Sequence, residues 1–345
     1  MKILTFFGVF FLLFLVSCSN ELKEVESNQI IVVSSKIDSL YSALFLKQYL
    51  DLKNRFMPIE ENYYNLKWIT PNDFNLFKAY PLIICLKISS PKDQTGDAFY
   101  DRMFKNKNDS SKVDIINNYY SKNQSIIGIE AIDAIEFKNI LFNYDSILSD
   151  CMVNRIDADI FSKYKEIPKN ENIIDDIRNK FGLDIVLDHN YEYIRNNDSL
   201  LWVGRGRPSL GDPIRWVIVK EIDKCLNPRL CLSEIQNTFN EIVKDSSLLR
   251  ISDFQDRNSY KLTHNNNYII GGTYVHSDIF VFGDKVDTIP KVGGPYVSYI
   301  YNINNNKSVL FIGLINNPGN NKMIYLKQIE SVFKQIKKKG EYSYE

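Results

Sequence analysis

The first pattern along the chain is an apolar run at its start. Lys2 is followed by apolar or small residues from Ile3 to Val16, and after Ser17-Cys18-Ser19-Asn20 the chain becomes polar. This order is typical of an export signal peptide. A membrane-spanning helix needs about 20 apolar residues, and this run is several residues shorter. The pattern therefore favours a signal over a permanent span.

The residues before Cys18 resemble a bacterial lipobox, in which a small residue precedes the cysteine whose sulfur receives a diacylglycerol. We expect residues 1–17 to be a lipoprotein signal peptide and the acyl chains on Cys18 to hold the protein to a lipid bilayer, at about 0.8 kcal/mol per buried methylene. Ser19 after the cysteine favours the outer membrane, on its periplasmic or surface face. The alternative is an ordinary secretory signal or uncleaved anchor, with Cys18 an incidental small hydrophobe.

Alternating strand and helix patterns follow a short polar tether at 18–27. The β-branched run at 29–34 predicts a strand. The apolar residues that recur at helical spacing after it are Ile37, Leu40, Tyr41, Leu44 and Tyr49. Similar patterns predict strands at 66–69, 82–88 and 125–129, a short helix begun by Pro71 and Asn72, and one long helix within 132–165. Residues 28–167 are therefore expected to form an α/β-like half.

The pattern changes after Pro168. Asn170 or Asn172 can cap a short helix that Gly182 closes. The rest is rich in short strands, which we predict at 183–187, 191–194, 200–203, 214–222, 268–275, 279–282, 296–303 and 308–315, with a helix at 232–243. Met323, Leu326, Ile329, Phe333 and Ile336 form one face of a closing helix. The expected class is α+β, with 168–340 forming a half with a largely antiparallel sheet.

The composition excludes one class of partner. Lysine plus arginine equals aspartate plus glutamate, at 42 each among 345 residues. No basic excess of the kind that nucleic-acid binding requires is present. We therefore expect no nucleic-acid partner.

The cysteines after the lipobox suggest no metal or cofactor, because no CxxC pair and no nearby histidine accompany them. Cys225 and Cys231 bracket a proline turn that can bring them within bonding distance, and export would permit a disulfide. A disulfide and two free thiols both remain open for this pair. Cys85 and Cys151 are expected to be buried thiols.

Two short segments carry candidate chemistry. Gly204-Arg205-Gly206-Arg207-Pro208 could cradle a phosphate through its glycine amides and arginines. Because no helix is predicted to follow, a hairpin tip is the favoured interpretation. Asp188-His189 suggests catalysis, but no GxSxG elbow or HExxH helix is present. A structural role is therefore favoured, and no catalytic residue is assigned.

Several sequence phrases resemble a family of uncharacterised Bacteroidetes lipoproteins catalogued as a domain of unknown function. The likeness covers residues 28–337. It rests on the lipobox, the opening strand and helix, Ile177–Ile185, Leu201–Val203, Gly293–Tyr299 and Tyr325–Glu330. The resemblance implies a lipid anchor and no particular reaction.

Two functions follow as hypotheses. The first is a membrane-anchored envelope lipoprotein that binds another envelope component, a protein or a glycan. The alternative is an envelope hydrolase whose site is built from scattered residues. A deep pocket that gathers Asp188, His189 or an arginine cluster with a buried carboxylate would favour the enzyme, and a flat apolar patch the binder.

Overall fold

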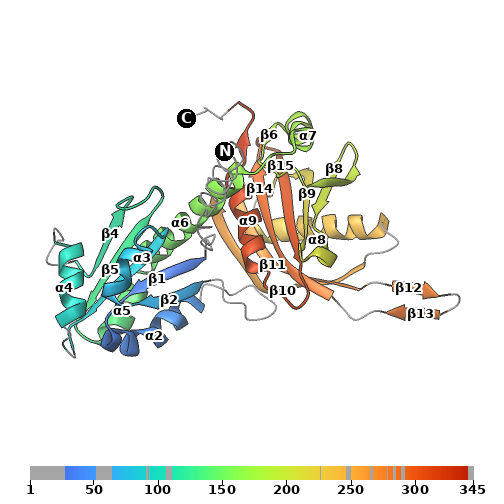
Figure 1. Cartoon of the computed structure of the whole chain (residues 1–345). Coiled ribbons are helices and arrows are strands. Elements are labelled where there is room, and N and C mark those ends of the chain that lie inside the picture. Colours follow the sequence, from blue (N-terminus) through green and yellow to red (C-terminus); the bar gives the residue numbers. More distant parts are fainter. Residues whose placement is uncertain are drawn as a thin grey trace, which may run out of the picture.

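The computed structural model describes residues 28–51, 64–90, 92, 94–105, 111–225, 227–245, 250–264, 267–277, 279–282, 285–288 and 292–340. Two β-sheets lie on either side of the long helix α6 (Asp145–Glu166), and helices cover both (Figure 1). The expected α+β class is confirmed. The predicted signal peptide, the lipidation site Cys18 and the tether lie outside the described residues. In the ranges given above, no helix has both the length and the apolar content needed to cross a bilayer.

The first sheet is five-stranded, in the order β2-β1-β3-β5-β4. Its first four strands in that order are parallel, and β4 is an antiparallel edge strand. The strands are β1 Gln29–Val33, β2 Asn65–Ile69, β3 Leu82–Ile88, β4 Val113–Asn117 and β5 Ser125–Ala131. The β3 and β5 strands are buried along almost their whole length, as parallel strands covered on both faces are. The expected α/β-like arrangement of this half is therefore present.

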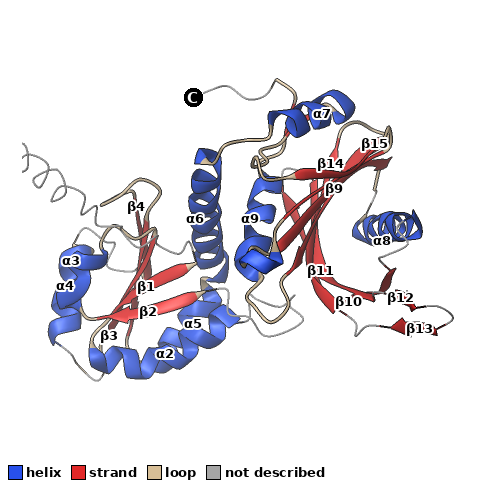
Figure 2. Cartoon of the chain, turned by 45° about the vertical axis from the view of Figure 1, so that its right-hand side comes forward, coloured by secondary structure: helices blue, strands red, loops and turns tan. Residues whose placement is uncertain are grey.

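Helices cover both faces of this sheet. On one face, α2 (Lys36–Asp51) and α5 (Ala134–Asn143) lie side by side (Figure 2). The other face carries the short helices η1 (Pro71–Asp73) and α3 (Phe74–Phe77) together with α4 (Gln94–Met103). The side chains on the first face also belong to the apolar cluster that includes residues of α6.

Helix α2 buries a different side from the one that its apolar spacing suggests. Of the regularly spaced apolar side chains, Tyr49 is buried, but four are exposed: Ile37, Leu40, Tyr41 and Leu44. The buried side begins instead with Asp38 and Ser42, both fully enclosed. Asp38 accepts a hydrogen bond from the Ile88 amide at 3.4 Å, and the Ser42 hydroxyl donates to the Asp38 carbonyl at 2.6 Å. Because these buried polar groups are hydrogen-bonded, the helix tolerates them in the core.

The single helix predicted within 132–165 is two helices. The helix α5 ends where Tyr144 leaves helical geometry at φ −102° and ψ 18°, and α6 begins at Asp145. Asn143, Asp145 and Ser146 favour helix ends over helix interiors because their side chains compete for backbone groups. The apolar spacing continues across the break, which is why periodicity alone does not reveal it.

The second sheet is seven-stranded and antiparallel, in the order β10-β11-β14-β15-β9-β8-β7. Its strands are β7 Glu192–Asn196, β8 Leu200–Arg205, β9 Ile214–Asp223, β10 Arg250–His264, β11 Asn267–Ser277, β14 Val292–Asn302 and β15 Lys307–Asn316. The expected antiparallel sheet is thus present, but the sequence patterns did not indicate β10. Helix α9 (Met323–Lys334) covers one face and α8 (Pro228–Asp245) the other (Figure 2).

Two small pairings complete the fold. Strands β12 (Ile279–Phe282) and β13 (Lys285–Thr288) form a hairpin. The predicted strand at 183–187 is only β6 (Leu183–Asp184), which pairs with β16 (Lys337–Lys338) near the end of the described chain. The chain after α9 therefore returns to the start of the second half.

A single apolar cluster joins the two sheets. It includes Ile84 under the first sheet, Phe137 of α5, Ile156 of α6, and Phe311 and Phe333 under the second sheet. The rings of Phe311 and Phe333 lie 5.7 Å apart. As predicted, the closing helix contributes its apolar face to this core. The two halves are therefore packed through α6 and α9.

Buried charges cross this α6–α9 contact. The Lys334 ammonium lies 2.5 Å from Asp157 of α6 and 2.8 Å from Glu330, and Lys327 lies 3.0 Å from Glu330. Burial alone would raise the pKa of Glu330, but the two ammonium groups outweigh it and hold that pKa well below its ordinary value. Burial raises the pKa of Asp157, which shares Lys334 with Glu330. We call these four side chains the α6–α9 charge cluster.

Candidate functional site

The candidate site is built on a turn that follows α7 (Glu171–Phe181). As predicted, Asn170 caps this helix by accepting from the Ile173 amide at 3.2 Å, and Gly182 ends it with φ +69°. The following chain folds back on the segment before the helix, where the His189 amide donates to the Pro168 carbonyl at 2.8 Å. This turn leads directly into β7.

A buried carboxylate lies at the centre of the turn. The Asp188 side chain is fully enclosed and accepts from the Tyr164 hydroxyl at 2.8 Å and from the Asn190 amide at 3.0 Å. It also pairs with Arg205 of β8 at 2.6 Å. Burial raises the pKa of Tyr164 well above its ordinary value, so that the phenol remains a donor. Asp188 therefore ties α6, the turn and the second sheet together.

A second carboxylate extends this pairing to the β8–β9 loop. Asp212 pairs with Arg205 at 3.3 Å and with Arg215 of β9 at 2.6 Å. The Arg215 guanidinium lies over the Tyr325 ring of α9 at 4.6 Å. The loop also contains η2 (Pro208–Leu210), which begins directly after Arg207. Two arginines and two aspartates thus neutralise one another and hold the loop in place.

The apolar floor of the site depends on Gly204 of β8. A Cβ atom there would lie 2.6 Å from Ile194 on β7 and 2.7 Å from Trp216 on β9, closer than real Cβ contacts. The glycine therefore lets side chains of two flanking strands approach across β8. The Trp216 indole packs edge-on against Trp202, with ring centroids 5.3 Å apart.

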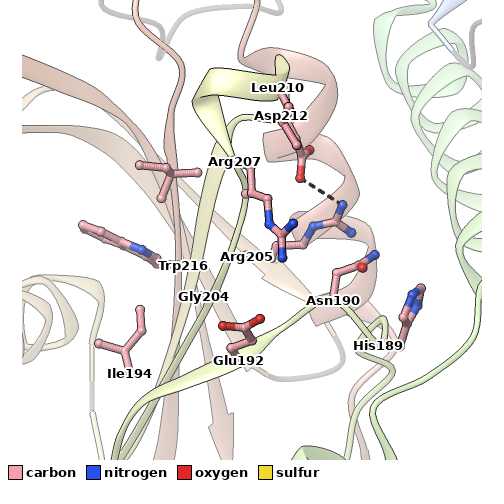
Figure 3. Close-up of a pocket in the computed structure, with 12 residues that line it drawn as sticks. His189, Asn190, Glu192, Ile194, Gly204, Arg205, Arg207, Leu210, Asp212 and Trp216 are labelled. Atoms are coloured by element: carbon pink, nitrogen blue, oxygen red, sulfur yellow. Dashed lines mark hydrogen bonds and ion pairs between the residues drawn. The ribbon is translucent and has the colours of Figure 1, made fainter.

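These elements surround a pocket of about 610 Å³. Figure 3 shows Ile194 and Trp216 on one side and His189 and Asn190 on the opposite side. Arg207 and Glu192 lie between these two sides. In the described part of the chain, neither the Arg207 guanidinium nor the Glu192 carboxylate makes a hydrogen bond or ion pair. The pocket thus offers one uncompensated cation, one uncompensated anion and an aromatic wall.

The structure confirms the favoured interpretation of Gly204–Pro208 as a hairpin loop, and the phosphate cradle stays a prediction. Strands β8 and β9 form a hairpin, as favoured, and the loop between them also lines the pocket. Asp188 and His189 have different roles: the Asp188 carboxylate binds Tyr164 and Arg205, whereas the His189 ring lies 3.3 Å from the Pro168 carbonyl.

Sequence patterns missed Glu192, Asp212 and Trp216 as pocket residues. The only local signal for Trp216 was its place in a strand two residues from Ile214. Its contact with Gly204 depends on strand register, which pairs Gly204 with Trp216 directly.

The two cysteines considered for a disulfide are neighbours. Both Cys225 and Cys231 are free and buried. Their side chains are hydrogen-bonded to each other, and this bond lowers the pKa of Cys225 below its ordinary value. The disulfide itself stays a prediction. Among the residues that the structure describes, no group of histidine, cysteine, aspartate and glutamate side chains is arranged to hold a metal ion.

Comparison with known proteins gives distant similarities only. No family of known proteins matches the chain, and no curated protein matches it significantly. Similar solved structures include LpqN, involved in cell envelope biogenesis of Mycobacterium tuberculosis, with 9% identity, a TM-score of 0.23 and coverage of 45% of this chain and 81% of that one. Another is the lipid transfer and protein localization domain of human StarD13 (DLC2), with 12% identity, a TM-score of 0.19 and coverage of 47% and 95%. Human StAR-related lipid transfer protein 5 has 8% identity, a TM-score of 0.19 and coverage of 53% and 97%. Similarity this low assigns neither fold nor function.

Proposed function

We propose that this chain is a lipid-anchored envelope lipoprotein that binds an anionic envelope glycan in the pocket between β7, β8 and β9. The observation that carries the proposal is the uncompensated Arg207 guanidinium in a pocket that the indole of Trp216 also lines. An arginine pairs with a carboxylate or phosphate through two parallel hydrogen bonds. An aromatic face offers an apolar surface to a sugar ring.

The remaining polar groups favour a glycan over a bare anion. Glu192 would repel a free phosphate, but its carboxylate can accept hydrogen bonds from sugar hydroxyls, and the Asn190 amide can donate or accept them. A pocket of about 610 Å³ falls within the range of small-molecule sites. We therefore expect one or two sugar units to fill it.

The site is held in advance of binding. Asp188 and Asp212 fix Arg205, and Arg205 precedes the Gly206-Arg207 turn. Because the supporting ion pairs are buried or half-buried, the loop needs little reordering to receive a ligand. The proposed acyl chains on Cys18 would keep this pocket close to the envelope polymers that it binds.

The test is the binding of defined sugars, monitored by tryptophan fluorescence, to which Trp68, Trp202 and Trp216 all contribute. Oligogalacturonate supplies a carboxylate, a phosphorylated oligosaccharide supplies a phosphate, and a neutral oligosaccharide of the same length supplies neither. We expect either or both anionic ligands to bind and the neutral one to bind more weakly. Loss of one charge-assisted contact in Arg207→Gln should weaken binding roughly tenfold or more.

A matched arginine variant controls for net charge. Arg229 is exposed on α8, away from the pocket, so Arg229→Gln removes the same charge without touching the site. Equal affinity of the Arg207 and Arg229 variants, or equal binding of charged and neutral sugars by the parent, would contradict the proposal.

Hydrolysis is the second candidate, because the pocket does gather His189, an arginine cluster and the Glu192 carboxylate. The buried Asp188 is occupied by Arg205 and Tyr164, which argues against its acting on His189. Chromatography of the same sugars after prolonged incubation separates the two functions. Products that form with the parent and not with Glu192→Gln would favour the hydrolase.

A further inference from the structure

The outer side of α2 carries an unusual number of exposed apolar side chains. Its exposed apolar residues are spaced by three or four positions along one side of the helix. Their exposed fractions are 36% for Ile37, 75% for Leu40, 47% for Tyr41 and 62% for Leu44. We call these four side chains the α2 stripe. An apolar row of this kind marks an interaction surface.

The charges around the α2 stripe have one sign. Lys36 and Lys47 are exposed at its two ends, and the only acidic residue between them, Asp38, is enclosed in the core. Apolar residues flanked by lysines are typical of helices that lie in the interface of a bilayer with anionic lipids. The aliphatic stems of these lysines can lie along the apolar layer while the ammonium groups reach the lipid headgroups.

The neighbouring helix adds to this side of the molecule. Ile132 and Ile135, at the start of α5, are 59% and 70% exposed. Helices α2 and α5 lie side by side, and both follow the carboxyl ends of parallel strands, so their first turns lie at the same edge of the sheet (Figure 2). Exposed apolar side chains are therefore present on both of these neighbouring helices.

The length of chain before the fold places this surface near a membrane. Only nine residues, or ten residue-to-residue steps, lie between Cys18 and Asn28, where the described structure begins. At roughly 3.3–3.6 Å per residue, even a fully extended segment reaches no more than about 36 Å. An acylated Cys18 would therefore hold the first sheet and its helices close to the bilayer.

We propose that the α2 stripe, with Ile132 and Ile135, rests on the surface of the membrane that holds the lipid anchor. This inference depends on the anchor proposed above. A second copy of the chain is a poorer occupant, because a symmetric contact would bring Lys36 and Lys47 of both copies together. The carboxylates at the start of α5 are already engaged: Asp133 caps the helix, and Glu136 pairs with Lys112. A bilayer containing anionic lipid satisfies the apolar and the charged groups at once.

The test places a reporter on the intact lipoprotein in vesicles of phosphatidylethanolamine with a minority of phosphatidylglycerol. An environment-sensitive fluorophore is attached to the cysteine of Leu44→Cys. The parent protein, treated in the same way, gives the background labelling of the native cysteines. Leu76→Cys is the matched control, since Leu76 is 78% exposed on α3, over the opposite face of the first sheet. We expect a blue-shifted emission and quenching by brominated lipid for position 44 and neither for position 76.

Each outcome decides the proposal. Equal emission and equal quenching at both positions would overturn it. Quenching at position 44 that disappears with Leu40→Ser, in protein with an unchanged circular dichroism spectrum, would support it. Blue-shifted emission at position 44 in detergent without vesicles, together with a dimer in sedimentation, would overturn the proposal in favour of a second copy of the chain. Fatty-acid labelling of the same protein separates the two failures: without label the anchor fails, and with label but an exposed reporter only the membrane contact fails.

Discussion

The α6–α9 charge cluster should make a large contribution to stability, and Lys334→Met tests this directly. The substitution keeps a long side chain but removes the ammonium that lies 2.5 Å from Asp157 and 2.8 Å from Glu330. Both carboxylates are buried, at 8% and 1% exposure, so that neither can turn to water. Removing one partner of a buried pair costs roughly 3–5 kcal/mol. That is a substantial part of the roughly 5–15 kcal/mol that holds a typical protein folded.

The stability lost in Lys334→Met should depend on pH in a definite direction. In the parent, the pKa of Glu330 is held below its unfolded value, so ionised Glu330 contributes stability above about pH 4.5 and loses it as the pH falls. In Lys334→Met, Glu330 keeps its pair with Lys327, and Asp157 loses the ammonium of Lys334. The folded-state pKa of Asp157 should then rise further, which makes acidification favourable to the variant. The deficit should therefore shrink between pH 7.5 and pH 5.

The assay is urea unfolding followed by circular dichroism at both pH values. Lys163→Met is the control, because Lys163 forms a more exposed pair with Asp159 on the same helix α6. Exposed pairs contribute about 0–1 kcal/mol. If Lys334→Met loses no more than Lys163→Met, or if its deficit does not change with pH, the reasoning about the buried cluster is wrong.

Three further predictions concern the anchor, the floor and the core. Cys18→Ala should leave the precursor without lipid, because the thiol accepts the first acyl group, and equal incorporation of a labelled fatty acid into parent and variant would contradict this. Gly204→Ala should reduce sugar affinity, because its Cβ would displace Ile194 or Trp216. Calorimetry measures the affinity, and a parent-like value would show that the apolar floor at Gly204 is not needed for binding. Phe333→Ala should cost about 3–5 kcal/mol, because its ring is 1% exposed in the shared core. Thermal denaturation measures that loss, and a parent-like melting temperature would exclude it.

Local rules predicted the elements that depend on local chemistry. The Asn170 cap and the left-handed Gly182 were visible because short side-chain and backbone preferences define helix ends. Strands β14 and β15 were visible as two apolar runs, and the consecutive asparagines between them favour the turn that joins them. These features require no knowledge of the rest of the fold.

Features that depend on distant partners were not visible. Periodicity identified helix α2 but could not show that Asp38 would bond to Ile88, so the buried side of the helix was hidden. The candidate site shows the same limit. Asp188 meets Tyr164 and Arg205 only because α6, the turn and β8 converge, and no sequence spacing encodes that meeting.

The pairing of β6 with β16 constrains the order in which the parts of the protein can fold during synthesis. The two strands are separated by almost half of the chain, and the Lys339 amide also donates to the Gly182 carbonyl at 3.0 Å. The parallel strands of the first sheet all precede residue 132, so that sheet can assemble while the rest is still being synthesised. The segment that carries Asp188 cannot acquire its neighbouring strand until residues 337 and 338 have been added. A polypeptide that stops short of residue 337 would therefore contain every pocket residue but lack the strand that closes the adjoining turn.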